Sequence, residues 1–202
     1  HGVDDRFRAA PRTQAAPHAF SDSHPFRLLY VSTVAPYKHQ AKVIEAVELL
    51  RNQGLPITIA LVGAMDPPQP NLMEALHRIA QSGGWAEWQG HIPFESLPRV
   101  YYEADAFVFA SSCENLPNIL LEAMASGLPI ASSNRGPMPE VLGKAGVYFD
   151  PEDAASIAAA LQLLFTDSEL RGELASSAYE EASRYSWQLC AERTFAYIAQ
   201  VA

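Results

Sequence analysis

From Phe26 onward, the chain alternates regularly between short apolar runs and longer stretches in which apolar residues recur at helical spacing. The apolar runs predict strands over residues 26–32, 57–62, 86–89, 106–110, 129–132 and 146–149. The stretches between them predict helices over residues 38–52, 72–80, 94–103 and 117–126. Because strands that alternate with helices form a parallel sheet covered on both faces, we expect an α/β fold whose ligands bind at the carboxyl ends of the strands.

Both ends of the chain differ from this alternation. Residues 1–25 are rich in Pro, Ala, Arg, His and Ser without an apolar period, which predicts a linker or a poorly ordered lead-in. After the last predicted strand, residues 153–165, 168–184 and 187–202 predict three helices with no strand between them. We therefore expect one domain over residues 26–202, with a helical C-terminal tail.

Composition narrows the classes of function. With 202 residues, 49% of them hydrophobic, the chain can bury one substantial core. Its formal net charge of -9 argues against a nucleic-acid partner or an anionic membrane surface, because proteins that bind these carry basic charge. The two cysteines, Cys113 and Cys190, match no metal or redox spacing, and no apolar run is longer than a strand. We expect a cytoplasmic protein without a disulfide framework.

The most informative segment follows the fourth predicted strand, where Glu114 and Glu122 flank a helix start at Pro117. Proline suits the first helical position, because that position needs no N–H partner. The first amides of a helix are unpaired and lie at the positive end of its dipole, so the backbone of Leu116–Ile119 can hold a phosphate. Asn118 and Glu122 lie one turn apart on one face, which places Glu122 to hydrogen-bond a ribose beside that phosphate. Glu114, in the preceding loop, is then near whatever the phosphates carry.

These residues resemble a known family. Glu114 and Glu122, separated by seven residues, are followed by Ala-Met-Ala-Ser-Gly-Leu-Pro. Further positions have the family's order: Lys38 after the first strand, Gly63 after the second, Gly90 before Pro-Phe-Glu-Ser-Leu, and Gly-Pro-Met-Pro-Glu-Val after the fifth. From about Phe26 to its end, the chain is similar to the C-terminal, nucleotide-binding domain of retaining GT-B glycosyltransferases of family 4, the glycosyl transferases group 1.

The resemblance implies a Rossmann-like parallel sheet with helices on both faces, which is one half of a GT-B fold. It also implies an enzyme that moves a sugar from a nucleotide diphosphate sugar to a hydroxyl acceptor with retained anomeric configuration. No metal or other cofactor is expected, because a cation and backbone amides can stabilise the negative charge of the leaving nucleoside diphosphate.

Roles for individual residues follow from the same resemblance. Glu114 lies near the donor sugar, and Glu122 binds the ribose. Lys38 is a cation on the diphosphate, so Glu114 and Lys38 are the catalytic candidates. With Glu122, the donor-binding candidates are Thr33, Gly63, Leu116, Pro117, Asn118, Ile119 and Arg135.

One position departs from the family's pattern. The usual Gly-Arg, followed four residues later by Lys-Gly, is replaced here by Ser32-Thr33 and Lys38-His39. Thr33 cannot supply the charge of the absent arginine, so stabilisation of the diphosphate depends more heavily on Lys38 or on another cation such as Arg135. We expect the missing arginine to affect sugar transfer more than donor binding.

The start of the chain, His-Gly-Val-Asp followed by Arg6-Phe7, resembles the segment between the two domains of the family. The acceptor-binding N-terminal domain has no counterpart in these 202 residues. We expect this chain alone to bind a donor without efficient transfer, and residues 186–202 to form a helix that crosses to the missing domain. The predicted partners are the nucleotide sugar and that N-terminal domain. Peripheral membrane association through that domain is a further possibility.

Alternatives to these interpretations remain. One alternative is that the chain is a non-catalytic nucleotide-binding or regulatory module. Individual residues also have structural explanations: dipole stabilisation for Glu114 and Glu122, a strand end for Gly63, and solvation for Arg135. A dinucleotide oxidoreductase is disfavoured, because Ser-Thr-Val-Ala-Pro follows the first strand in place of Gly-x-Gly-x-x-Gly. The base, the donor sugar and the acceptor are not readable from the sequence.

Overall fold

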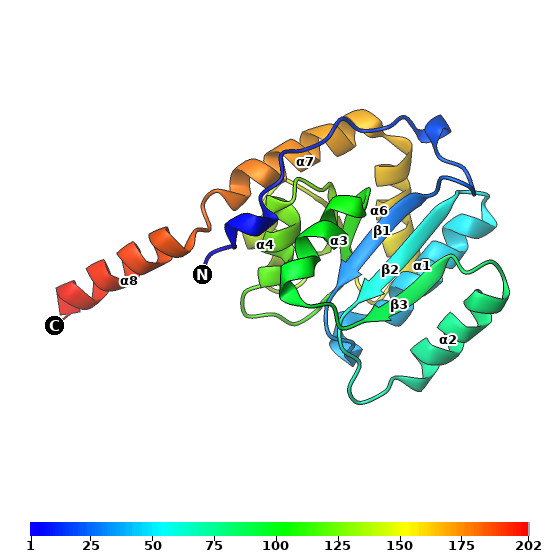
Figure 1. Ribbon diagram of the computed structural model, residues 1–202, viewed down its shortest axis with the longest axis horizontal. Helices are drawn as coiled ribbons and strands as arrows, with labels where there is room; N and C mark the ends of the chain where they lie inside the picture. Colours follow the sequence, from blue (N-terminus) through cyan, green and yellow to red (C-terminus); the bar gives the residue numbers. More distant parts are fainter. Residues whose placement is uncertain (202) are drawn as a thin grey trace.

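The computed structural model describes residues 1–201 and shows a six-stranded parallel sheet between layers of helices (Figure 1). The strands lie in the order β3-β2-β1-β4-β5-β6, so the direction of winding reverses between β1 and β4. Their bounds are β1 (Phe26–Val31), β2 (Ile57–Val62), β3 (Ala86–Gly90), β4 (Ala106–Phe109), β5 (Ile130–Ser133) and β6 (Val147–Phe149). The predicted Rossmann-like α/β fold is confirmed.

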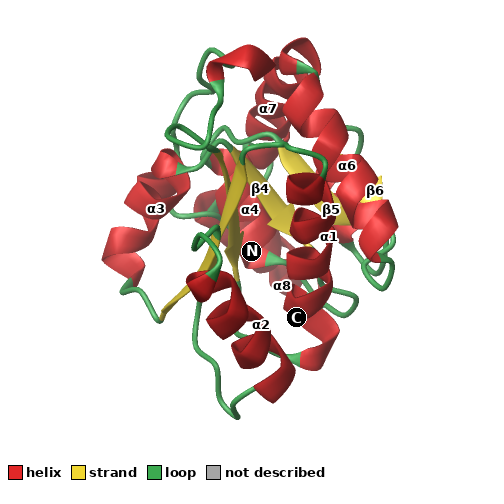
Figure 2. Ribbon diagram, turned by 90° about the vertical axis from the view of Figure 1, so that its right-hand side faces the viewer, coloured by secondary structure: helices red, strands yellow, loops and turns green. Residues whose placement is uncertain are grey.

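Helices cover both faces of the sheet, as the view in Figure 2 shows. α1 packs against α2 and α6, whereas α4 packs against α7. Right-handed crossovers on either side of the reversal place these two groups on opposite faces. The helices are α1 (Gln40–Asn52), α2 (Pro70–Gln81), α3 (Leu97–Glu103), α4 (Asn118–Ala125), α5 (Met138–Leu142), α6 (Ala154–Thr166), α7 (Ser168–Ala182) and α8 (Trp187–Val201).

Strand bounds agree with the sequence prediction to within one residue, whereas helix starts differ by up to three residues. The helix predicted over residues 38–52 is divided into a 3-10 turn, Pro36–Lys38, and α1, with His39 in a left-handed conformation between them. α4 begins at Asn118, so the prediction of Pro117 as its first helical residue is wrong by one position. Pro117 instead caps α4, since its carbonyl oxygen accepts hydrogen bonds from amides in the first turn of the helix. Ala202, the end of the last predicted helix, lies outside the described residues.

Residues 1–25 pack along the domain, in contrast to the poorly ordered lead-in that their composition predicts. Val3 and Phe7 are buried, although two apolar residues among polar and charged neighbours do not make a sustained apolar period. The amide of Ala9 donates a 3.0 Å hydrogen bond to the carbonyl of Ala125 at the end of α4. Gly127 is required at this crossing, because its φ is +64° and a Cβ there would lie 2.6 Å from the Ala9 carbonyl oxygen.

The C-terminal helix α8 extends away from the rest of the domain (Figure 1). None of its described residues is buried, and its large apolar side chains are exposed: Trp187, Phe195, Tyr197, Ile198 and Val201. An exposed apolar set of this kind is unusual for a helix with no partner, because it leaves apolar area in water. Among residues 1–201, no helix is long and apolar enough to cross a membrane.

A buried arginine fastens the N-terminal segment to the helical tail. Arg171 in α7 is fully buried, and its guanidinium donates hydrogen bonds to the carbonyl of Phe165 at 2.8 Å and to Gln14 Oε1 at 3.2 Å. It also donates to the carbonyl of Ala15 and lies over the ring of Phe26, 5.3 Å from the ring centroid. Its partners are neutral oxygens, so the pairing works by hydrogen bonds and not by an ion pair.

We predict that Arg171→Met lowers the free energy of unfolding by about 3 kcal/mol, because several buried oxygens lose their donor while the side-chain volume is kept. Urea denaturation followed by circular dichroism measures the change. Arg184→Met is the matched control: Arg184 is exposed and pairs with Glu181 on the surface, so this change should stay within about 0.5 kcal/mol of the parent. Equal stability of the two variants would contradict the role of Arg171.

Candidate functional site

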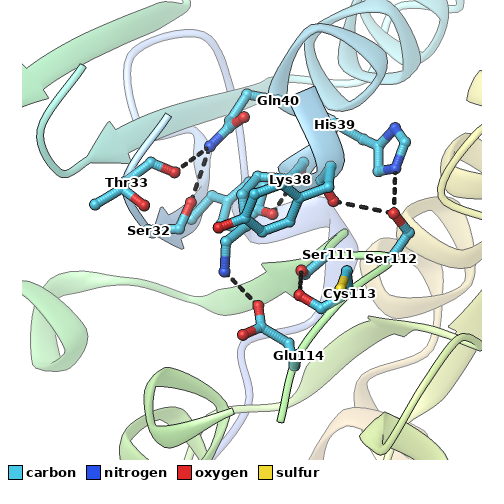
Figure 3. Close-up of polar contacts among 11 residues, drawn as sticks. Ser32, Thr33, Lys38, His39, Gln40, Ser111, Ser112, Cys113 and Glu114 are labelled. Carbon is cyan, nitrogen blue, oxygen red and sulfur yellow. Dashed lines mark hydrogen bonds and ion pairs between the residues drawn. The ribbon is translucent and has the colours of Figure 1, made fainter. Parts of the chain in front are cut away.

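Lys38 and Glu114 form a buried ion pair at the carboxyl ends of β1 and β4 (Figure 3). The Lys38 side chain is 6% exposed and the Glu114 side chain 16% exposed, and Lys38 Nζ donates to Glu114 Oε1. The hydroxyl of buried Tyr30 donates to the Lys38 carbonyl at 2.6 Å, which holds the 3-10 turn on the sheet. The ammonium also lies 5.3 Å from the ring centroid of Phe109. The lysine is thus a fixed cation at the point where the strand order reverses.

His39 follows the lysine in a strained conformation. Its φ of 53° and ψ of 30° are left-handed values that favour glycine. Its Nε2 lies 2.9 Å from Ser112 Oγ, in the loop after β4. Burial lowers the pKa of His39, against the opposing effects of Glu152 and Asp150, so the ring is mostly neutral at pH 7. His39 therefore does not supply the positive charge of the arginine for which Thr33 stands.

The start of α4 offers unpaired backbone donors beside this ion pair. The Pro117 carbonyl accepts from the amides of Leu120 at 2.9 Å and Leu121 at 3.2 Å. Within residues 1–201, the amides of Leu116 and Ile119 have no hydrogen-bond partner. Such amides at the positive end of a helix are suited to an anion.

Glu122 lies in a separate environment on α4. The hydroxyl of Tyr101 donates to Glu122 Oε2 at 2.9 Å. Burial raises the pKa of Glu122 to about 7, although the Tyr101 hydrogen bond lowers it. Glu122 lines a cavity of about 300 Å³, together with Gly2, Val3, Asp4, Phe94, Asn118 and Trp187. The cavity lies between the start of the chain, α4 and the start of α8.

The other candidate residues each have contacts within the protein. Thr33 is exposed, and its carbonyl accepts a 3.0 Å hydrogen bond from Gln40 Nε2. Gly63 has a φ of 141°, and a Cβ there would lie 2.0 Å from the Ser32 carbonyl oxygen, so close packing of β2 and β1 explains this glycine. Arg135 is paired with Asp150 at 2.9 Å. Its guanidinium is therefore already engaged by a carboxylate.

Several residues that hold the candidate site residues in place could not be predicted from the sequence. Tyr101 is 21 residues before Glu122, and the run Val-Tyr-Tyr in which it lies gives no sign of which ring faces the core. Gln40 and Tyr30 act through backbone carbonyls, a use that leaves no pattern in residue types. Ser112 was within reach of prediction only as a polar residue after a buried strand.

Comparison with known proteins identifies the family. Residues 12–181 match the family described as "Glycosyl transferases group 1". The chain is 30% identical to O-antigen chain mannosyltransferase B of Escherichia coli, over 82% of this chain and 44% of that protein. It is also 30% identical to sulfoquinovosyl transferase SQD2 of Arabidopsis thaliana, over 93% of this chain and 36% of that protein. The chain thus spans less than half the length of these curated relatives.

Solved structures support the fold. The crystal structure of Anabaena HepE in complex with UDP aligns with a TM-score of 0.78 and 19% identity, over 100% of this chain and 56% of that one. At this identity the likeness concerns the fold, which is that of a GT-B glycosyltransferase half. Together with the match over residues 12–181, these findings show that the chain belongs to the glycosyl transferases group 1 family.

Proposed function

We propose that this domain binds the nucleoside diphosphate of a sugar nucleotide, and that the longer enzyme transfers the sugar to a hydroxyl acceptor with retention. The observation that carries the proposal is the Lys38–Glu114 ion pair, followed within a few residues of Glu114 by the unpaired amides at the start of α4. The relatives are named as glycosyltransferases, and HepE was crystallised with UDP, which supports the same ligand class.

The ion pair fits the electrostatics of this reaction. The leaving diphosphate gains negative charge as the glycosidic bond breaks, so a fixed cation beside it stabilises the transition state. One carboxylate oxygen of Glu114 holds Lys38 in place before the donor arrives. In the proposed role, the other carboxylate oxygen of Glu114 faces the donor sugar. No metal is needed in this scheme, because Lys38 and the helix amides supply the positive charge.

The anomeric configuration is retained in this proposal because the acceptor hydroxyl attacks the donor sugar on the same face from which the nucleoside diphosphate leaves. The acceptor hydroxyl then loses its proton to the leaving phosphate itself. Among the candidate residues, Glu114 orients the donor sugar and Glu122 binds the ribose, so neither is assigned as the base.

A second domain completes the proposed enzyme. The curated relatives extend well beyond the region that this chain covers. The exposed apolar side chains of α8, including Trp187 and Phe195, provide a surface on which that domain can pack. We therefore propose that these 202 residues bind a donor but do not transfer efficiently, and that turnover requires the N-terminal acceptor-binding domain.

A non-catalytic binding module is the second candidate, and Thr33 in place of arginine favours it. The two functions separate in an assay of the longer protein with a sugar nucleotide. Release of nucleoside diphosphate that depends on acceptor supports the transferase, whereas donor binding without any release supports the module.

We predict that Lys38→Met weakens binding of the preferred nucleotide among UDP, GDP and ADP by about tenfold or more, because a buried charge-assisted contact to phosphate is lost. Isothermal titration in EDTA and in Mg²⁺ measures the affinities, which should agree if no metal takes part. Lys42→Met is the control, since Lys42 is exposed and pairs with Glu45. Unchanged affinity in a folded Lys38→Met variant excludes the lysine from the diphosphate site, and a Lys38→Met/Glu114→Gln double variant avoids an unpaired buried carboxylate.

A second prediction concerns the ribose. The parent protein should prefer a ribonucleoside diphosphate to its 2′,3′-dideoxy form, and Glu122→Gln should reduce this preference about tenfold. The preference should rise between pH 6 and pH 8, because Glu122, with its pKa near 7, loses its proton and becomes a stronger acceptor for the ribose hydroxyls. The ratio of the two affinities cancels titration of the phosphates, which both ligands share. A parent ratio that is flat with pH, and equal to that of Glu122→Gln, rejects the ribose assignment.

A further inference from the structure

One oxygen of the Glu122 carboxylate is already held by the protein. Tyr101, in α3, donates to Oε2 at 2.9 Å. No described residue donates a hydrogen bond to Oε1, and Glu122 lines the 300 Å³ cavity beside α4. A carboxylate held at one oxygen keeps the other available for a ligand in a defined direction.

The Tyr101 ring has little freedom to move. Its side chain is fully buried, and Phe7 meets it edge-on at a centroid distance of 5.5 Å. Phe107, on β4, lies on it at 5.6 Å. Because the N-terminal segment, α3 and the sheet together fix this ring, its hydroxyl is a preorganised donor.

We propose that Tyr101 is the positioning residue of the ribose site: its hydroxyl fixes Oε2 of Glu122 so that Oε1 accepts from the ribose hydroxyls. The inference rests on the proposed function, since Tyr101 acts only through the contact of Glu122 with a nucleotide. It adds a group on α3, an element to which the proposed function gives no role.

The charges around Glu122 set the direction of the pH effect. Asp4, across the cavity, raises the pKa of Glu122, and hydrogen bonds from Arg6 lower the pKa of Asp4 to about 2, so Asp4 stays ionised. The ring of His1 lies 6.0 Å from that of Trp187, which lines the cavity. The Tyr101 hydrogen bond favours the ionised form of Glu122. Removing it shifts ionisation of Glu122 to higher pH.

The test compares Tyr101→Phe with Tyr102→Phe. Tyr102 is the next residue on α3 and is 58% exposed, so its variant loses a hydroxyl without touching Glu122. Affinities are measured between pH 6 and pH 9 for UDP, GDP and ADP and for the 2′,3′-dideoxy form of each. We expect Tyr101→Phe to reduce the ribose preference about threefold or more, to shift its rise with pH to higher pH, and to leave dideoxynucleotide affinity unchanged.

A double variant removes the ambiguity of altered folding. In the Glu122→Gln background, Tyr101→Phe should have little further effect on the ribose preference, because the two groups act as one unit. Equal ribose preference and equal pH dependence in Tyr101→Phe and the parent overturn the inference. So does a weakening of ribo and dideoxy forms alike, which indicates a merely structural tyrosine. Failure of the parent to bind any of the three nucleotides instead overturns the proposed function.

Discussion

The reversal of strand order between β1 and β4 is the constraint on which the site depends. These strands pair in parallel through Leu28 with Ala106 and Leu29 with Phe107, although almost 80 residues separate them in sequence. The helices that follow them, α1 and α4, cover opposite faces, so the loops at the two strand ends diverge. Lys38 comes from one loop and Glu114 from the other, and their ion pair joins the two sides.

Two carboxylates eight positions apart acquire different properties from this geometry. Glu114 pairs directly with the ammonium of Lys38, which is held in place by the surrounding fold. Among the described residues, only the Tyr101 hydroxyl donates a hydrogen bond to the Glu122 carboxylate, and burial raises the pKa of Glu122 to about 7. The first carboxylate is therefore compensated before any ligand arrives. The second remains incompletely solvated, which makes a pair of ribose hydroxyls favourable partners for it.

Much of this arrangement could be predicted from the sequence. The strands are short continuous apolar runs because both of their faces are covered, and this pattern located them to within one residue. The prediction was weaker where backbone details decide the structure. Proline suits both the cap and the first position of a helix, so Pro117 alone could not set the start of α4. Phe7 and Arg171 showed no pattern, because each works through contacts with residues distant in sequence.

The site candidates show the same limit. Lys38 and Glu114 were predicted as two separate residues of one site, and the structure adds that they pair directly. Arg135 was a candidate cation, but proximity to Asp150 depends on how the loops after β5 and β6 fold, which residue types do not encode. Gly63 was attributed to the donor site, whereas the nearness of the Ser32 carbonyl is sufficient to require a glycine there.

His39 bears on how such a site tolerates change. A left-handed histidine costs on the order of 1 kcal/mol relative to glycine, and that cost persists only where neighbouring contacts oppose relaxation. Here the Lys38 carbonyl is held by Tyr30, the His39 ring contacts Ser112, and Gln40 is bonded to the turn after β1. The three consecutive residues are thus fixed by three different elements. The direction of the Lys38 side chain therefore follows from the sheet and the loop after β4, and does not require the flexibility of a glycine beside it.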